Sequence, residues 1–256
     1  GFEKGHQYNF SILAHALEGN VKVSIEAVDE NGKPIGRASL EEVNGDWKTY
    51  RTSFTPTETA SKGKLNVQFE GQGKIEIDMV SLFPADTWKH RPNGMRADLV
   101  QKLAGLKPGF MRFPGGCIVE GRDLVNRYQW KSTVGDVADR KLIINRWNME
   151  MKDHQAPDYF QSFGLGFYEY FQLCEDIGAS PLPILNCGMA CQYNSAEVVS
   201  LNQIDPFIQD ALDLIEFANG GPDTKWGKLR AAMGHPAPFN MKMIGVGNEQ
   251  WGEQYV

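Results

Sequence analysis

The sequence predicts a jelly-roll-like β-sandwich followed by an α/β region that forms part of a (β/α)8 TIM barrel. Over residues 1-86, polar and apolar side chains alternate in short runs that turn-forming residues separate. From residue 87 onward, helical repeats alternate with short apolar runs, which is typical of β/α units around a parallel sheet. The last apolar run ends in an Asn-Glu pair. We therefore expect two domains, at 1-86 and 87-256.

The first domain has the pattern of a half-buried sheet. Val21–Val28 places its apolar side chains on one face, and the turn-forming cluster Asp29–Gly32 follows it. Similar runs occupy 47–54, 63–70 and 74–83. A series of about five antiparallel strands without a helix predicts a sandwich.

The second domain alternates helices with short strands. Met95, Leu99 and Leu103 follow a helical spacing, which Lys107-Pro108-Gly109 ends. Asp205-Pro206 predicts a helix start, with the proline in the first turn. The expected strands lie at 110–113, at 183–185 and in a run that begins at 243, and the later expected helices lie at 166–177 and 205–218.

The most informative motif is the run Met243–Gly252, which reads Met-Ile-Gly-Val-Gly-Asn-Glu-Gln-Trp-Gly. Its apolar part suits a buried parallel strand. Asn248 and Glu249 then stand at the carboxyl end of that strand, where (β/α) barrels build their active sites. A strand followed by a polar turn is the alternative. A dinucleotide-binding loop is excluded, because Gln250 stands where the third glycine is required.

The composition of the chain excludes several classes of binding partner. The 256 residues carry a formal net charge of -6 and no block of Lys or Arg, which argues against nucleic acid and against an anionic membrane. No apolar stretch approaches the length of a membrane span. The four cysteines are too few and too irregular for a disulfide scaffold, and no histidine stands near them to complete a zinc site.

Several further segments, together with the Asn-Glu strand end, carry a resemblance to a known family. The segments are Arg112–Cys117 with Val119–Gly121, Tyr128–Lys131, Gly164–Gly178, Phe207–Asp213 and Arg230–Pro236. With these segments, the chain resembles α-L-arabinofuranosidases of glycoside hydrolase family 51, in the branch with an inserted β-sandwich similar to a carbohydrate-binding module. The resemblance implies that the three strands are the second to fourth of the barrel, so that the chain is truncated at both ends.

The resemblance also implies the chemistry. Glycosidases place two carboxylates beside the bond that they cleave. No metal and no organic cofactor is implied, because the acid-base chemistry of two carboxylates needs neither. By resemblance, Glu249 is the general acid/base of a retaining mechanism, and Asn248 hydrogen-bonds the sugar 2-hydroxyl, although turn formation alone would also explain Asn248. The family nucleophile is a glutamate at the end of the seventh strand, which lies outside this chain. We therefore expect the chain alone to be inactive.

Other positions are expected to line the pocket. Gly116 lets the backbone approach a ligand, and Cys117 is carried over as a contact to arabinose hydroxyls, with a buried inert thiol as the alternative. Glu120 either lines the pocket or forms a loop ion pair. The remaining candidates are Arg112, which orients carboxylates or supports the structure, Asn186 at the pocket rim, and Trp251 as an apolar wall or as packing under the loop. On the sandwich, Trp47 and Tyr50 are either a sugar-stacking platform or ordinary core and edge residues.

The expected activity is removal of terminal arabinofuranose branches from arabinan or arabinoxylan. The loop at 140–163 departs from the family pattern, so the rest of the substrate is the least defined feature. Two alternatives stay open: an endo-acting glucanase or xylanase of related fold, and a non-catalytic carbohydrate-binding protein. The resemblance further implies an arabinose-containing polysaccharide or oligosaccharide as partner, a possible homo-oligomer, and secretion or a periplasmic location.

Overall fold

The computed structural model describes residues 1–144, 146–149 and 160–255. Two compact units divide the chain, Gly1–Gly105 and Leu106–Val256, so the first unit extends beyond the boundary expected at residue 86. Part of the divergent loop at 140–163, namely 145 and 150–159, lies outside the described residues. Within the described ranges, no helix is both long enough and apolar enough to cross a lipid bilayer.

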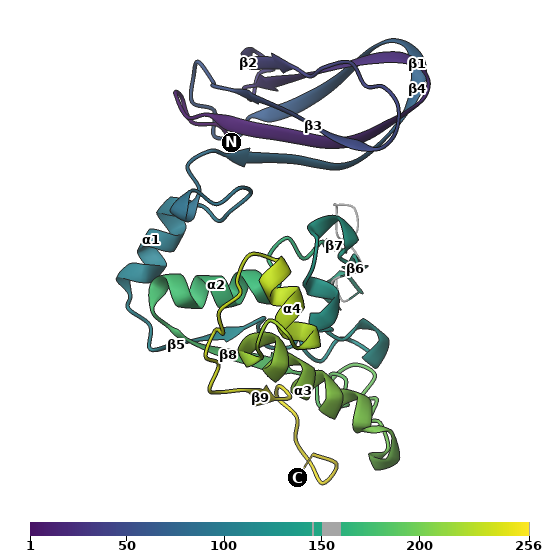
Figure 1. Ribbon diagram of the computed structural model, residues 1–256, viewed down its shortest axis with the longest axis vertical. Helices are drawn as coiled ribbons and strands as arrows, with labels where there is room; N and C mark the ends of the chain where they lie inside the picture. The colour runs from purple at the N-terminus through teal and green to yellow at the C-terminus, as the bar shows by residue number, and fades with distance from the viewer. Residues whose placement is uncertain (145, 150–159, 256) are drawn as a thin grey trace. The chain divides into compact units, whose positions relative to one another are not determined.

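The first unit is built on two long strands. β1 (Tyr8–Val28) and β4 (Lys64–Pro84) each contain 21 residues and pair antiparallel along their whole length. The first part of β1 also pairs with β3 (Lys48–Phe54), and its last part pairs with β2 (Pro34–Ser39). The β1–β4 ribbon folds over on itself, so these two parts form facing layers (Figure 1). The predicted sandwich is confirmed, although the runs at 63–70 and 74–83 form one strand.

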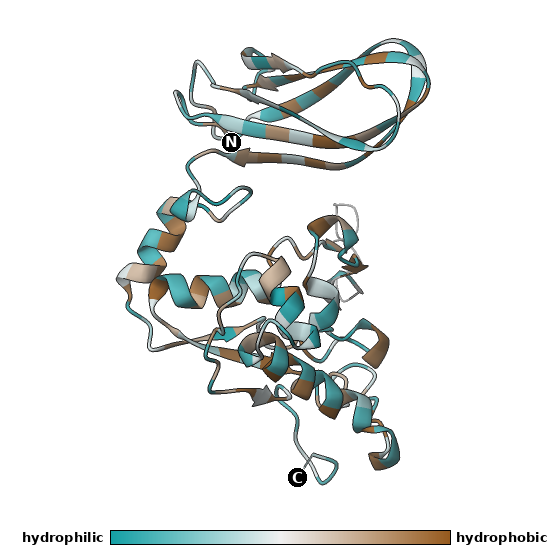
Figure 2. Ribbon diagram, in the orientation of Figure 1, coloured by the Kyte–Doolittle hydropathy of each residue, from teal (hydrophilic) through white to brown (hydrophobic). Residues whose placement is uncertain are grey.

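The fold-over of the ribbon needs a residue without a side chain. Gly19 has a φ of +62°, and a Cβ there would lie 2.2 Å from the Gln72 carbonyl oxygen of β4. On either side of this bend, the alternation along β1 and β4 appears as successive hydrophobic and hydrophilic bands (Figure 2). Ile12 and Ile25, from the two parts of β1, are both buried in one core. The period-2 pattern and the glycine together therefore produce two layers from one ribbon.

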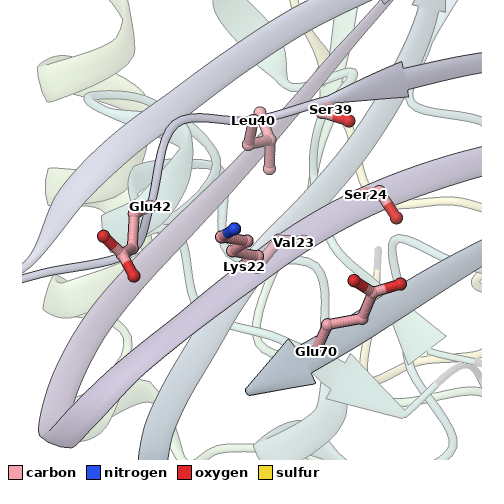
Figure 3. A pocket seen from close by; sticks show the side chains of 7 residues that line it. All are labelled: Lys22, Val23, Ser24, Ser39, Leu40, Glu42 and Glu70. Carbon is pink, nitrogen blue, oxygen red and sulfur yellow. The ribbon is translucent and has the colours of Figure 1, made fainter.

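The two aromatic residues considered as a sugar-stacking platform, Trp47 and Tyr50, differ in their exposure. Tyr50 is only 1% exposed, and its hydroxyl bonds the backbone of Asn44, so it is a core residue and not part of a sugar platform. Trp47 is half exposed beside His15, with 5.6 Å between the ring centroids. A separate pocket of about 240 Å³ has no aromatic residue in its lining (Figure 3); it is lined by Lys22, Val23, Ser24, Ser39, Leu40, Glu42 and Glu70.

A single α-helix, α1 (Ala97–Gly105), ends the first unit. Its position agrees with the helical spacing that begins near Met95. Lys107, just beyond the helix, has a φ of +49°, and Pro108 cannot donate the next hydrogen bond. The expected stop signal therefore acts as predicted.

The second unit contains the parallel sheet. β5 (Phe110–Phe113), β8 (Ser180–Leu185) and β9 (Gly245–Val246) lie in the order β5-β8-β9, and both pairs are parallel. The helices are α2 (Phe167–Ile177), α3 (Asp205–Asn219) and α4 (Lys225–Ala232). The predicted partial barrel is confirmed. The sequence pattern missed α4 and the short antiparallel pair β6 (Ile143–Ile144) and β7 (Phe160–Gln161).

Aromatic side chains fill the core that supports this sheet. Phe113 at the end of β5 stacks on Tyr170 of α2, with ring centroids 4.9 Å apart, and packs edge-on against Phe167. Glu169 stabilises the start of α2. Its carboxylate accepts from the backbone N–H of Gly166 at 2.9 Å and pairs with the buried guanidinium of Arg140. The strand end that carries the site therefore rests on a layer of packed aromatic side chains.

Candidate active site

The candidate site lies at the carboxyl ends of the three parallel strands (Figure 1). The loop with Gly115, Gly116 and Cys117 follows β5, the loop from Asn186 follows β8, and Asn248 and Glu249 follow β9. Parallel strands bring their carboxyl ends to one edge of a sheet. Residues more than 130 positions apart in the chain therefore meet there, as Arg112 and Asn248 do.

The carboxamide of Asn248 is held from both sides. The guanidinium Nη2 of Arg112 donates to Asn248 Oδ1 at 2.5 Å, and Asn248 Nδ2 donates to Glu120 Oε1 at 2.5 Å. Gly116 faces the same carboxamide, since a Cβ at this glycine would lie 3.5 Å from Asn248 Oδ1. Arg112 therefore orients an amide, whereas the sequence led us to expect that it orients carboxylates.

Glu249 occupies a strained backbone position. Its φ is +52°, a conformation that costs a non-glycine residue about 1 kcal/mol. The preceding Gly247, at φ +73°, has no space for a side chain, because a Cβ would lie 2.9 Å from Cys187 Sγ. The turn brings the exposed Glu249 side chain to Cys117, whose Sγ–H donates to Glu249 Oε2 at 3.2 Å. Glu249 thus lies beside the loop that contains Gly115, Gly116 and Cys117.

Glu120 lies below this surface and is only 2% exposed. One ligand atom from each of Cys117, Glu120 and Glu249 lies within 4.8 Å of the others. Among the described residues, this is the group close enough to hold a metal ion. Burial, with a smaller effect from Glu120, raises the pKa of the nearby Cys187 thiol, so this sulfur stays protonated near neutral pH.

Asn186 has a different place from the pocket rim expected for it. It is buried, and its Nδ2 donates to the carbonyl oxygens of Val119 at 3.1 Å and Met189 at 3.0 Å. Its Oδ1 accepts from the backbone N–H of Gly188 at 2.7 Å. These bonds use both ends of the carboxamide, so Asn186 fastens the loops after β5 and β8 together. Direct contact between Asn186 and a sugar stays a prediction.

Trp251 is 51% exposed, so it is not simply packed under its loop. Gln192 holds its backbone by two hydrogen bonds, one to Trp251 O at 3.0 Å and one from Trp251 N at 2.9 Å. Tyr193, 89% exposed, meets the indole edge-on with 5.8 Å between ring centroids. The sequence interpretation missed Gln192 and Tyr193, although their place after the strand expected at 183–185 was a usable signal.

Comparison with known proteins matches each of the two parts of the chain to a family model. Residues 102–256 match the family model described as "Alpha-L-arabinofuranosidase 1 domain", and residues 1–74 match one described as "Carbohydrate binding domain". The first match covers more than half of the chain. The chain therefore belongs to the α-L-arabinofuranosidase family.

Individual relatives agree with the family assignment. An extracellular exo-α-L-arabinofuranosidase of Streptomyces chartreusis is 43% identical over 97% of this chain and 30% of its own length. The α-L-arabinofuranosidase 1 of Arabidopsis thaliana is 36% identical over 99% of this chain and 36% of its own length. This arabinofuranosidase-family chain thus spans about a third of the length of these curated relatives.

A solved structure supports the same fold. The arabinose-bound family GH51 α-L-arabinofuranosidase called MgGH51 is 31% identical, with a TM-score of 0.83 over 97% of this chain and 40% of that chain. The resemblance to family 51 is confirmed, and so is the order of a carbohydrate-binding-module-like sandwich followed by part of the barrel.

Proposed function

We propose that this chain carries the acid/base half of a retaining exo-acting α-L-arabinofuranosidase. The observation that carries the proposal is the meeting of Glu249 with Cys117, beside the oriented carboxamide of Asn248. The substrate is a terminal arabinofuranose branch on arabinan or arabinoxylan. The arabinose bound to the related MgGH51 enzyme supports this sugar class.

Glu249 acts twice in the proposed mechanism. Its protonated carboxyl first gives a proton to the glycosidic oxygen as the bond to the departing sugar breaks. As a carboxylate, it then removes a proton from the water that releases arabinose from the covalent intermediate. Asn248 hydrogen-bonds the 2-hydroxyl, and Cys117 contacts the arabinose hydroxyls while its thiol holds Glu249 in place.

The nucleophile of this mechanism lies outside the present chain. Retaining glycosidases separate their two carboxyl groups by about 5–5.5 Å. Glu120 lies close enough to Glu249 for such a role, since their oxygens are within 4.8 Å. However, Glu120 is buried and bonded to Asn248, so its carboxylate does not face an anomeric carbon. In this proposal Glu120 is therefore not the nucleophile.

An assay with three aryl glycosides tests the function. We expect the full-length protein to release 4-nitrophenol from the α-L-arabinofuranoside at least about 100-fold faster than from the β-xyloside or β-glucoside, because its pocket selects the furanose. The 256-residue chain alone should give no turnover. Preference for the β-xyloside would support the related xylanase instead, and turnover by the chain alone would place the nucleophile within it.

The exposed pair of Trp251 and Tyr193 supports a second prediction, about the sugar that carries the branch. Aromatic faces stack on sugar rings. Trp251 lies two residues after Glu249, and Tyr193 of the loop after β8 contacts its ring, while Gln192 of that same loop bonds the Trp251 backbone. Tyr193→Ala or Trp251→Ala should raise the KM for arabinoxylo-oligosaccharides about 10-fold, because remote contacts are lost.

Hydrolysis of the aryl arabinofuranoside is the internal comparison for this pair, since this substrate has no sugar beyond the cleaved bond. Its kinetic constants should change less than about 2-fold in both variants. Leu201→Ala, at an equally exposed position of the loop after β8, should leave both substrates unaffected. Equal losses on the two substrates would show that the aromatic pair does not bind the branch-bearing sugar.

The same proposal also bears on the location of the protein, its partner and its need for a cofactor. We infer secretion or a periplasmic location, which the extracellular Streptomyces relative supports. The match of residues 1–74 to a carbohydrate-binding domain supports a polysaccharide partner, for which Trp47 offers a half-exposed indole. No metal or organic cofactor is needed, because the proposed chemistry uses carboxyl groups alone.

A further inference from the structure

We propose that Glu120 is a positioning residue that holds Asn248 as a hydrogen-bond donor toward the sugar. This inference rests on the proposed function, in which Asn248 contacts the 2-hydroxyl. It assigns Glu120 a task other than the pocket lining or loop ion pair expected from the sequence. Glu120 acts through a neighbour, because a residue that is only 2% exposed does not line an open pocket.

The two neighbours of Asn248 impose opposite requirements on its carboxamide. The guanidinium of Arg112 has only donors, so it requires the amide oxygen. The carboxylate of Glu120 is an acceptor when ionised, so it requires the amide nitrogen. A rotation of 180° about the terminal bond of Asn248 would place oxygen against oxygen and nitrogen against guanidinium. Together the two neighbours therefore select one of two orientations of the carboxamide.

The selected orientation determines what Asn248 can offer a sugar. An amide NH2 has two N–H donors, and Glu120 accepts from one of them. Among the described hydrogen bonds, the second N–H has no acceptor, so it can donate to a hydroxyl oxygen. Arg112 occupies the amide oxygen from the other side. The site therefore presents an N–H donor, from which a sugar hydroxyl can accept a hydrogen bond.

The arrangement of Arg112, Glu120 and the Asn248 carboxamide forms when the protein folds, before a sugar binds. Glu120 and Asn248 are 128 positions apart and lie in the loops after β5 and β9. Asn186 anchors the backbone of Glu120 itself, since its Nδ2 also donates to the Glu120 carbonyl oxygen at 3.3 Å. A charge-assisted hydrogen bond in a buried place is strong and directional. The carboxamide thus needs no reorientation during the reaction.

A comparison of two substrates tests the role of Glu120 in the full-length protein. One is 4-nitrophenyl α-L-arabinofuranoside, and the other is its 2-deoxy analogue, which lacks the hydroxyl that Asn248 contacts. Glu120→Ala should lower kcat/KM about 100-fold on the first substrate and less than about 3-fold on the second, because the lost contact is absent there already. Glu120→Gln keeps an oxygen acceptor and should recover activity to within about 10-fold.

Two further variants separate positioning from general support. Glu169→Ala weakens the start of α2 without touching Glu120 or Asn248, so it should lower both activities by the same factor. If Glu120→Ala does not fold, Arg112→Ala takes its place as the test, because Arg112 is exposed and its removal deletes the hydrogen bond to the Asn248 amide oxygen. It too should lower kcat/KM more on the arabinofuranoside than on the 2-deoxy analogue. An equal loss on both substrates would overturn the inference while the function stands. Absence of arabinofuranoside hydrolysis by the unaltered protein would overturn the proposed function, and the sugar contact with it.

Discussion

Glu249→Gln in the full-length protein is expected to lower kcat for release of arabinose from arabinoxylan by about 1000-fold. Glutamine keeps the size of glutamate and can still accept the hydrogen bond from Cys117, but it has no proton to give to the leaving oxygen. The strained φ of +52° at this position is unchanged by the substitution. The loss therefore reports proton transfer and not a change of shape.

Substrates with different leaving groups distinguish a general-acid role of Glu249 from a structural or binding role. 4-Nitrophenolate departs with little help from an acid, so the first step on the aryl arabinofuranoside should be slowed far less than on arabinoxylan. Added azide, a nucleophile that needs no general base, should then restore turnover and give arabinosyl azide. Initial rates on the two substrates, with and without azide, are the measurements. Equal losses on both, without rescue by azide, would remove Glu249 from the acid/base role.

Arg230→Met is expected to destabilise the second unit by about 4 kcal/mol. Arg230 is fully buried, and its guanidinium donates to backbone carbonyl oxygens of two separate segments. The acceptors are Phe217 at 2.7 Å, Gly220 at 2.8 Å, and His235 and Pro236 at 2.9 Å each. Methionine fills much of the same volume but leaves these four carbonyl groups without donors, so the end of α3 loses its link to the chain after α4.

Urea denaturation, followed by circular dichroism and tryptophan fluorescence, measures this free energy of unfolding. Lys228→Met is the matched control, because Lys228 is an exposed cation on the same helix; it should change stability by less than about 0.5 kcal/mol. A loss below about 1 kcal/mol in Arg230→Met would mean that water or other groups satisfy the four carbonyls.

Residues that act within their own strand end were predictable from the sequence. Asn248 and Glu249 follow an apolar run, and the position of a polar pair at a strand end is a local property. Tyr50 was harder to place, because alternation defines two faces of a strand without saying which face is covered. The structure shows its ring buried and its hydroxyl bonded to Asn44. The Glu120–Asn248 contact was not predictable, since nothing in either local pattern refers to the other.

The sequence by itself determined the order of a sandwich and a parallel β/α region, the family, and the strand-end pair that carries the proposed chemistry. These features depend on periodicity and on short motifs, which are properties of neighbouring residues. Only the tertiary structure decided that the β1–β4 ribbon folds into two layers, that Asn186 fastens loops, and that Arg112 and Glu120 orient Asn248. The physical reason is that contacts between distant residues depend on strand register and on loop packing, which the whole fold sets together.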